Sequence, residues 1–359
     1  MATHRLSSGR GSGVTIQDVA DLAQVSIKTV SRVLNHEPGV AAKTREAVQA
    51  AAQTLRYQPN PAARNLSSAV GNNIGFAFPV PSRREGKGEL AYSMALQLGA
   101  LLACGRLDLG VLLQPRQRKD AAEAAELVEL MQGRRISGLV VADPDAHLIQ
   151  RLQAQGVMFS AINANELEGG YPVVAVDDRP AAERMTAMLI AHGHRRIGFV
   201  QGRDGTRVAA DRLAGFRAAM ATAGLPVDPA WIAQGDFSFD AGLQAGLALL
   251  RQAPRVSAIF AANDTMAMGV VHAAHSMGLN VPGDLSAVGF DDLDGVELFW
   301  PPLTTIHQPL GSMAEMAVEQ LAARMFPHRR DIPARPALHV FACELVERAS
   351  VAAPPREPP

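Results

Sequence analysis

The sequence has few cysteines, few aromatic residues and almost no net charge. Only Cys104 and Cys343 occur among the 359 residues, which excludes a disulfide framework and a cysteine-rich zinc cluster. No apolar run approaches the roughly 20 residues that cross a membrane. The first residues also lack the apolar stretch of a signal peptide. We therefore expect a cytoplasmic protein.

The net charge of −1 hides an uneven distribution along the chain. Residues 1–70 carry eight Lys and Arg against four Asp and Glu, a net charge of +4, and the remainder carries −5. A small basic segment joined to a larger acidic one is typical of a DNA-binding module attached to a second function. With 48% hydrophobic residues, the chain has enough apolar content for two or three folded domains.

Residues 14–35, VTIQDVADLAQVSIKTVSRVLN, have the pattern of a helix-turn-helix. Thr15 and Ser26 are suited to cap two amphipathic helices, and the small Ala20 and Ala23 permit a close crossing. A third amphipathic stretch at residues 42–55 offers an apolar face that closes a three-helix core, with its apolar positions at Ala47, Val48, Ala51 and Leu55. The alternative is an ordinary helical hairpin.

In a helix-turn-helix, the start of the second helix enters the major groove of DNA. Ile27, Lys28 and Arg32 occupy the exposed positions there. Lys28 and Arg32 can donate to guanine, and Ile27 can pack against a thymine methyl group. Contacts to phosphates are expected from polar side chains near the helix ends, namely Thr15, Ser26, Ser31, Asn35 and Thr44.

The segment YQPNPAARNLSS, residues 57–68, predicts a short hinge helix. Asn60 can cap it and Pro61 suits its first turn. So short a helix is marginal in water alone and needs an outside partner. Leu66 is its apolar residue and a candidate wedge for the minor groove, with Asn60 and Ala63 beside it. The alternative is a linker with an incidental leucine.

The rest of the chain alternates short apolar runs with helical stretches such as residues 121–132 and 146–155. This alternation predicts parallel sheets wrapped by helices, in two blocks. The runs that read as buried strands are residues 73–80, 109–115, 137–143, 157–163, 172–178, 196–202, 258–264 and 285–292. Ligands bind such folds beyond the carboxyl ends of the strands. Polar residues gather at these ends: Asn163, Asp177, Asn263, Asp264, Asp291 and Asp292.

No catalytic motif is present. The glycines of GRGSG precede the first helix of the head instead of following a strand, so a dinucleotide site is excluded. His192 and His194 lie at a helix-to-strand turn, where a capping role is expected and metal binding is not. The sequence has no nucleophile elbow and no phosphate-binding loop. We expect a ligand sensor that is not an enzyme and that uses no cofactor or metal.

Segments of the predicted helix-turn-helix head, of the hinge and of the larger body resemble the LacI/GalR family of bacterial transcriptional regulators. In the head the resemblance rests on TIQDVADLAQVS, KTVSRVLN, KTREAV and LRYQPNPAARNLSS. In the body it rests on AVDD, GHRRIGFVQG, DRLAGFRAAM, FAANDTMAMG, VPGDLSAVGFDD and PPLTTIHQP. It spans roughly residues 14–350 and implies a helix-turn-helix head, a hinge helix and a two-lobed α/β effector domain like a periplasmic binding protein. It also implies the base-reading role of Ile27, Lys28 and Arg32, and the minor-groove role of Leu66.

The resemblance also implies a division of the chain. We expect a disordered extension at 1–13, the DNA-binding domain at 14–58, the hinge at 59–71, the effector-binding and dimerisation domain at 72–350, and a disordered tail at 351–359. Within the effector domain, the first lobe is expected at about 72–175 and 306–335, and the second at about 176–305 and 336–350. The tail has no leucine heptads, so a tetramer-forming coiled coil is not expected.

The ligand contacts implied by the resemblance are Asn163, Arg212, Phe237, Asn263, Asp291 and Gln308. Their chemistry suits a sugar, because amide and carboxylate groups bind hydroxyls and an aromatic face stacks on a sugar ring. Phe239 is the rival of Phe237 as the aromatic residue. Three positions depart from the family pattern: Gln24, Asn163 and Val208. A basic loop with Arg83, Arg84 and Lys87 leaves an acidic or phosphorylated sugar as an alternative.

The sequence thus predicts a homodimeric, nucleoid-associated repressor of the sugar-sensing branch that binds a palindromic operator. Ligand binding between the lobes is expected to change the spacing of the hinge helices and so the affinity for DNA. Two alternatives remain: a repressor that needs a purine-type corepressor, and a solute-binding protein without a DNA role.

Overall fold

The computed structural model describes residues 14–34, 39–57, 72–80, 89–116, 122–134 and 136–355. The chain divides into two compact units, Met1–Gly71 and Asn72–Pro359. Several predicted positions lie outside the described residues: Asn35, the hinge residues Asn60, Ala63 and Leu66, and the loop residues Arg83, Arg84 and Lys87. Within the described part of the chain, no helix is long and apolar enough to cross a membrane.

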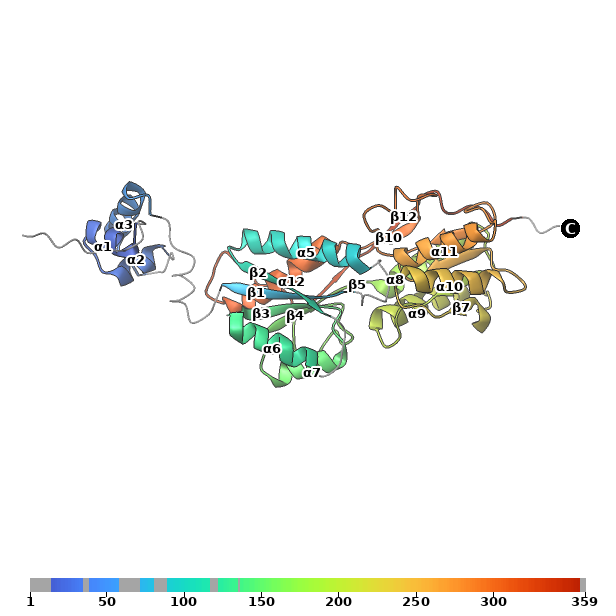
Figure 1. The fold of residues 1–359 in the computed structure, drawn as a ribbon, viewed down its shortest axis with the longest axis horizontal. Coiled ribbons are helices and arrows are strands. Elements are labelled where there is room, and N and C mark those ends of the chain that lie inside the picture. The colour runs from blue at the N-terminus through green and yellow to red at the C-terminus, as the bar shows by residue number, and fades with distance from the viewer. Residues whose placement is uncertain are drawn as a thin grey trace, which may run out of the picture. The chain divides into compact units, whose positions relative to one another are not determined.

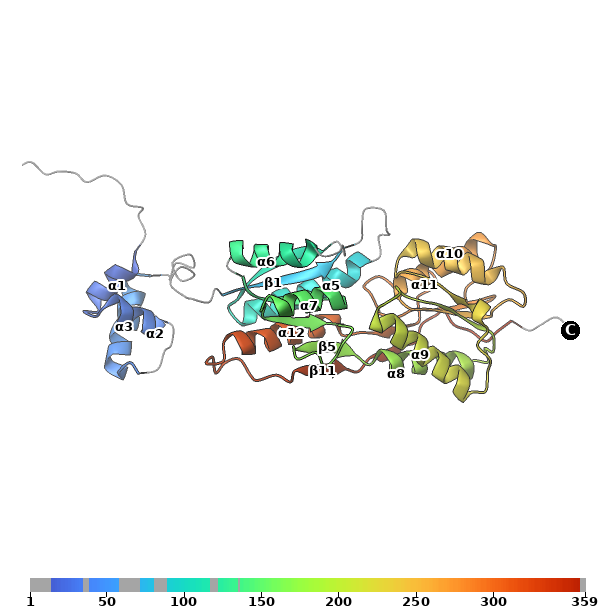
Figure 2. The same cartoon turned by 90° about the horizontal axis from the view of Figure 1, so that it is seen from below.

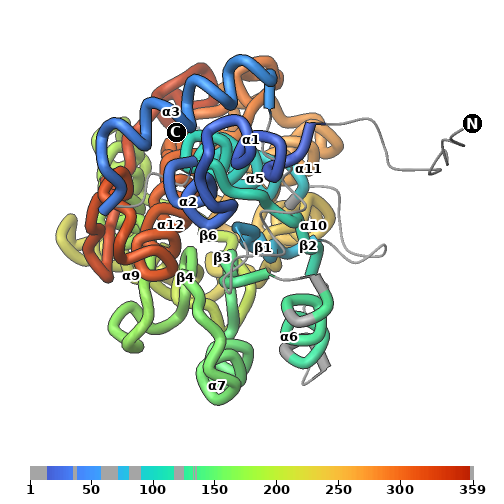
Figure 3. The backbone as a smooth tube through the Cα atoms, turned by 90° about the vertical axis from the view of Figure 1, so that its left-hand side faces the viewer, coloured from blue at the N-terminus to red at the C-terminus, as the bar shows by residue number. Residues whose placement is uncertain are grey.

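The smaller unit contains a three-helix head, as predicted (Figure 3). Its helices are α1 (Ile16–Leu22), α2 (Ile27–Leu34) and α3 (Ala42–Thr54). The apolar faces of the three helices meet in a small core made of Val19, Ala20, Val30, Val33, Val48 and Ala51. One predicted core residue is wrong: Ala47 is exposed, because α3 turns only Val48 and Ala51 fully inward.

Both predicted caps of the head are present. The Thr15 hydroxyl accepts from the backbone N–H of Asp18 at 3.4 Å, and the Asp18 carboxylate accepts in return from the backbone N–H of Thr15 at 2.7 Å. The Ser26 hydroxyl accepts from the backbone N–H of Thr29 at 3.1 Å and so begins α2. Between the helices, Gln24 has a φ of +51°. Glycine adopts this left-handed conformation more easily, and here a glutamine holds it.

The larger unit is built on two parallel sheets, as the alternating pattern predicts (Figure 1). The first sheet has the order β2 (Gly110–Arg116), β1 (Asn73–Pro79), β3 (Ile136–Ala142), β4 (Phe159–Ile162), β5 (Val173–Val176) and β11 (Leu338–Phe341). The second has the order β7 (Ile232–Ala233), β6 (Ile197–Val200), β8 (Ala258–Ala261) and β9 (Ser286–Val288). A small antiparallel pair joins β10 (Thr305–His307) and β12 (Glu344–Val346).

Helices cover both faces of each sheet (Figures 1 and 2). In the first lobe, α5 (Glu89–Arg106) and α12 (Leu310–Met325) pack together on one face, and α6 (Ala122–Arg134) and α7 (Ala146–Ala154) lie on the other. In the second lobe the pairs are α8 (Asp178–Ala191) with α9 (Arg207–Thr222), and α10 (Phe239–Leu250) with α11 (Asp264–Ser276). Every residue of β4, β5, β6 and β8 is buried, which explains why these strands are apolar except for Ser160 of β4.

Two expected boundaries are wrong. Strand β11 pairs in parallel with β5, Leu338 opposite Val173, so residues 338–341 belong to the first lobe and not to the second. The start of the expected disordered tail is ordered, because the backbone N–H of Ala352 donates to the Ser286 hydroxyl at 3.1 Å. The Ala352 carbonyl also lies 3.0 Å from a ring nitrogen of buried His194.

The chain passes between the lobes three times: from β5 to α8, from β10 to α12, and from β11 to β12. Two of these crossings are tied to each other. The backbone N–H of Cys343 donates to the Asp177 carboxylate at 2.7 Å, and Arg184 donates both to Asp177 and to the Cys343 carbonyl. The crossings bring the carboxyl ends of strands from both sheets to one place, where polar side chains gather.

Candidate functional site

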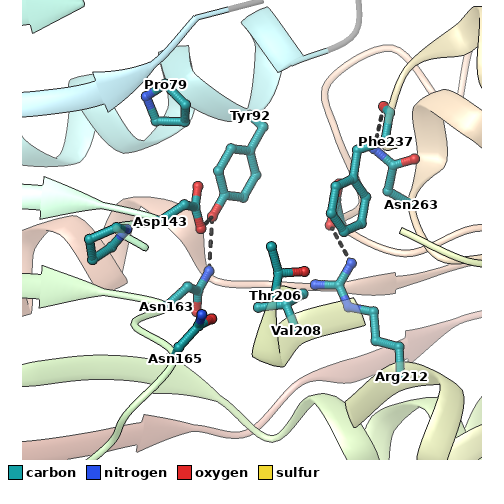
Figure 4. Close-up of a pocket in the computed structure, with 12 residues that line it drawn as sticks. Pro79, Tyr92, Asp143, Asn163, Asn165, Thr206, Val208, Arg212, Phe237 and Asn263 are labelled. Carbon is teal, nitrogen blue, oxygen red and sulfur yellow. Dashed lines mark hydrogen bonds and ion pairs between the residues drawn. The ribbon is translucent and has the colours of Figure 1, made fainter. Parts of the chain in front are cut away.

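A cleft lies between the two lobes of the larger unit (Figure 4). Its open space is about 650 Å³, including the part that opens to solvent. Five of the six predicted ligand residues line it together. The full lining is Pro79, Tyr92, Asp143, Pro144, Asn163, Asn165, Thr206, Val208, Arg212, Phe237, Asn263 and Asp291. Their role in binding a ligand stays a prediction.

Strained backbone marks the cleft. Asp143, Asn163, Phe237 and Asp291 all line it, and their φ angles are +47°, +56°, +76° and +123°. Residues other than glycine pay about 1–3 kcal/mol for such conformations, which therefore gather where function requires them. Four such residues around one space make the cleft a candidate binding site.

Arg212 on α9 is the buried centre of the charge network, with 3% of its surface exposed. Its Nε donates to the Asp178 carboxylate at 2.9 Å, and its Nη1 donates to the Ala262 carbonyl at 2.6 Å. The same nitrogen lies 3.5 Å from the carboxylate of Asp291. The guanidinium also stacks on the ring of Phe290, 3.7 Å from the ring centroid. These contacts fix Arg212 in place before any ligand arrives.

Asp291 is also buried, with 4% of its surface exposed. Burial raises the pKa of Asp291 to about 7, although the nearby Arg212 acts to lower it. Gln308 does not line the cleft as the resemblance implied. Its Nε2 donates to the Asp291 carboxylate at 2.6 Å from outside the lining. Gln308 therefore orients Asp291.

Asn163 follows β4 and is linked to two residues that the sequence analysis missed. Its Nδ2 donates to the Tyr92 hydroxyl at 2.9 Å, and that hydroxyl donates to the Asp143 carboxylate at 3.3 Å. Burial, together with the charges of Asp143 and Asp291, raises the pKa of Tyr92 well above its usual value. Asp143 follows β3 as Asn163 follows β4, so its position at a strand end was the available signal. Tyr92 lies inside α5, and its place in the sequence gave no signal of a role in the site.

Asn165 and Arg207 connect the two lobes at the edge of the cleft. The Asn165 Oδ1 accepts from the backbone N–H of Arg207 at 2.9 Å, and its Nδ2 donates to the Gly205 carbonyl at 2.9 Å. The Arg207 side chain returns a third hydrogen bond, from Nε to the Ala164 carbonyl at 3.1 Å. Neither side chain was predicted as part of the site.

Of the two candidate phenylalanines, Phe237 lines the cleft, together with Tyr92, and Phe239 does not. Its carbonyl accepts from Asn263 Nδ2 at 3.1 Å, and its ring lies over Gly202, where an added Cβ would come within 2.1 Å of the ring. Position 202 must therefore be glycine for this ring position. The ring of Phe239 instead packs edge-on against His272, 5.8 Å between centroids.

The two predicted capping histidines have different roles. A ring nitrogen of His192 lies 3.0 Å from the Met188 carbonyl at the end of α8, as expected of a cap. His194 is fully buried between the hydroxyls of Ser257 and Ser286, at 2.9 and 3.0 Å, so its capping role is wrong. Among the described residues, no cluster of His, Cys, Asp and Glu is arranged to hold a metal ion.

The candidate DNA-binding surface is the first turn and a half of α2. Ile27, with 43% of its surface exposed, and Lys28 face solvent, whereas Ser31 and Arg32 are half-buried. A Cβ added at Gly39, whose φ is +85°, would lie 3.3 Å from the guanidinium of Arg32. Among the predicted phosphate contacts, the Thr15 and Ser26 hydroxyls cap helices and Thr44 lies half-buried on α3.

A helix-turn-helix head joined to a two-lobed α/β body with a polar interlobe cleft defines a class of ligand-responsive transcriptional regulators. Residues 15–60 match the family described as bacterial regulatory proteins, lacI family. Residues 186–351 match the periplasmic binding protein-like domain. The chain belongs to the lacI family of bacterial regulatory proteins.

Relatives cover nearly the whole chain. The HTH-type transcriptional repressor PurR of Escherichia coli O1:K1 / APEC is 34% identical over 342 residues, 94% of this chain and 97% of the relative. A structure of the transcriptional regulator CelR in complex with cellobiose is 29% identical, has a TM-score of 0.69 and matches 94% of this chain and 99% of its own. A structure of the lac repressor dimer bound to operator and the anti-inducer ONPF is 26% identical, has a TM-score of 0.74 and matches 95% and 100% of the two chains.

Proposed function

We propose that this protein is a homodimeric transcriptional repressor whose affinity for a palindromic operator is controlled by a small, sugar-like ligand bound in the interlobe cleft. The observation that carries the proposal is the cleft itself. Buried charge, strained backbone and amide groups from both lobes converge there, in a chain that also carries a helix-turn-helix head.

The head supports DNA binding through exposed, basic and apolar side chains at the start of α2. Ile27 and Lys28 are free of the head core, and Arg32 lies one turn further along the same helix. These three side chains are proposed to contact base edges. Contacts to phosphates are proposed for the polar side chains near the helix ends: Thr15, Ser26, Ser31, Asn35 and Thr44. Contacts in the minor groove are proposed for the hinge residues Asn60, Ala63 and Leu66.

The cleft supports a sugar because it combines side chains that bind hydroxyls with the aromatic face of Phe237. Asn163, Asn263 and Asp291 offer amide and carboxylate groups, and Phe237 offers a ring for the C–H face of a sugar. The likeness to a regulator solved with cellobiose agrees with this choice. A purine-type corepressor is the second candidate, since a flat base can also stack on Phe237.

The proposed control acts through closure of the cleft. Three crossing segments join the lobes, and Asn165 and Arg207 already bridge them. A ligand that binds one arrangement of the lobes better than the other shifts the balance between them. Because the larger unit begins at Asn72, directly after the predicted hinge, such a shift is expected to change how the hinge segments present the heads.

The proposal is tested by selecting an operator from random DNA and titrating ligands into the complex. Fluorescence anisotropy follows the full-length protein on this DNA while neutral sugars, sugar acids and oxopurines are added. Release of DNA by a sugar identifies an inducer, and tighter binding with an oxopurine identifies a corepressor. If the protein binds a ligand but selects no specific DNA sequence, the result would instead indicate a solute-binding protein.

A further inference from the structure

Asn163 has one polar atom that the protein leaves without a partner. Only 5% of its surface is exposed, and its Oδ1 has no hydrogen-bond partner among the described residues. Its Nδ2, in contrast, donates to Tyr92. A buried acceptor without a donor costs about 1–3 kcal/mol, so an orphan of this kind at the wall of a cleft points to a ligand group that completes it.

The neighbouring hydrogen bonds fix the orientation of the Asn163 amide, with its nitrogen on the Tyr92 hydroxyl (Figure 4). The Tyr92 hydroxyl has a single proton, and it donates that proton to the Asp143 carboxylate at 3.3 Å. The phenolic oxygen is left as an acceptor, which only the NH₂ end of Asn163 can satisfy. The amide therefore cannot rotate without losing this hydrogen bond, and its oxygen is held on the side away from Tyr92.

We propose that Tyr92 is a positioning residue that makes this site selective for a ligand hydroxyl or amine group, because it holds the Asn163 oxygen where only a hydrogen-bond donor can meet it. The inference rests on the proposed function, since it requires that a small ligand occupy the cleft. Asn163 is the residue that touches the ligand, and Tyr92 acts through it.

The surrounding charges favour the same class of ligand. The described residues that line the cleft include two carboxylates, Asp143 and Asp291, and one cation, Arg212. Arg212 already donates to Asp178 and to the Ala262 carbonyl. An acidic group on the ligand would therefore meet the Asn163 oxygen and the Asp143 carboxylate, which is linked to Asn163 through Tyr92, whereas a neutral hydroxyl or an amine would meet a suitable partner.

The test measures ligand affinity in matched variants of the full-length protein. Cellobiose, glucose, galactose, xylose and ribose, their aldonic acids, and hypoxanthine are screened by thermal shift and then by calorimetry. Tyr92→Phe is expected to weaken binding of the best neutral sugar by about three- to tenfold, the value of one hydrogen bond. Tyr171→Phe is the control, because its hydroxyl donates to the Glu166 carbonyl, outside the cleft lining.

Selectivity separates positioning from a merely structural role. Among the monodeoxy analogues of the best sugar, one is expected to bind wild type about tenfold more weakly than its parent, because it lacks the donor for Asn163. In Asn163→Ala that analogue and its parent should bind equally, and in Tyr92→Phe the difference should shrink. Asn163→Asp keeps an acceptor and should retain the discrimination.

The outcomes distinguish this inference from the function on which it rests. If Tyr92→Phe binds every analogue as wild type does, or loses affinity for all of them equally, the positioning role is overturned and the cleft remains a ligand site. Stronger binding of an aldonic acid than of its neutral sugar would also overturn the inference that the site selects a hydrogen-bond donor on the ligand. If no probe binds wild type, the proposed sugar-sensing function fails, and this inference fails with it.

Discussion

The amide side chain of Asn165, just after β4 in the first lobe, receives a hydrogen bond of 2.9 Å from the backbone N–H of Arg207, the first residue of α9 in the second lobe. The same amide donates across the gap to Gly205, and the Arg207 side chain donates back to Ala164. Three hydrogen bonds thus join the lobes directly beside the cleft. Each contributes about 0.5–1.5 kcal/mol, enough together to shift the balance between an open and a closed cleft.

Asn165→Ala is expected to open the cleft, because it removes two of these three hydrogen bonds. Spin labels at exposed Gln150 on α7 and exposed Ala210 on α9 measure the distance between lobes by pulsed electron paramagnetic resonance. The variant should show a longer and broader distance distribution. Asn280→Ala, at an exposed asparagine of the second lobe, is the control. An unchanged distribution in Asn165→Ala would show that the link does not hold the lobes.

Arg212→Met is expected to destabilise the larger unit by about 3–5 kcal/mol, because it leaves the buried carboxylates of Asp178 and Asp291 without their main partner. Thermal and urea unfolding measure the loss. Arg217→Met on the same helix provides the control, since Arg217 is exposed, and a change within about 0.5 kcal/mol is expected there. Equal effects of the two substitutions would rule out a special role for the buried guanidinium.

His194→Gln is expected to change how stability depends on pH. Burial lowers the pKa of His194 from 6.5 to about 4. Between these values the unfolded chain binds a proton that the folded protein does not, so stability falls as the pH drops from about 6.5 to 4. Unfolding of wild type and variant across this range measures the effect, with His192→Gln as control. The difference in the free energy of unfolding between wild type and His194→Gln should change as the pH passes through this range. A difference that stays constant with pH would refute the lowered pKa of His194.

Arg32→Ala is expected to relax the preference for one base pair of the operator, at a cost of about 1–3 kcal/mol for a bidentate contact to guanine. Selection from random DNA followed by sequencing compares the variant with wild type. Lys43→Ala, at an exposed position of α3, is the control for general loss of positive charge and should weaken all sequences alike. A preference profile that matches wild type would remove Arg32 from the base-reading set.

Most helices and strands were predictable from the sequence, because the local pattern of apolar and capping residues agrees with the burial seen in the structure. Thr15 and Ser26 cap helices where the sequence places caps, and the predominantly apolar runs are strands buried on both faces. Strand β11 was assigned to the wrong lobe. It lies half-exposed at the sheet edge, and its partner β5 precedes it by more than 160 residues, so nothing local reveals the pairing.

From the residue pattern alone, the cleft was predictable only where a side chain follows a strand; Arg212 and Phe237 were expected from the family resemblance. Asn163 follows β4 directly, and Asn263 is the second residue after β8. Tyr92 reaches the cleft from within an apolar helix, and Arg207 begins α9 like any solvated arginine. Their roles depend on how α5 and α9 pack across the strand ends, which is a property of the fold and leaves no local pattern.

The most direct test of the account measures operator affinity with and without the best-binding ligand, in wild type and in Asp291→Ala. Because ligand and operator are proposed to bind linked conformations, a saturating ligand should change the operator Kd of wild type by about 5–150-fold, equivalent to about 1–3 kcal/mol. Asp291→Ala should bind operator normally without ligand and show no such change. An operator Kd that a saturating ligand leaves unchanged in wild type would contradict the coupling of cleft and head.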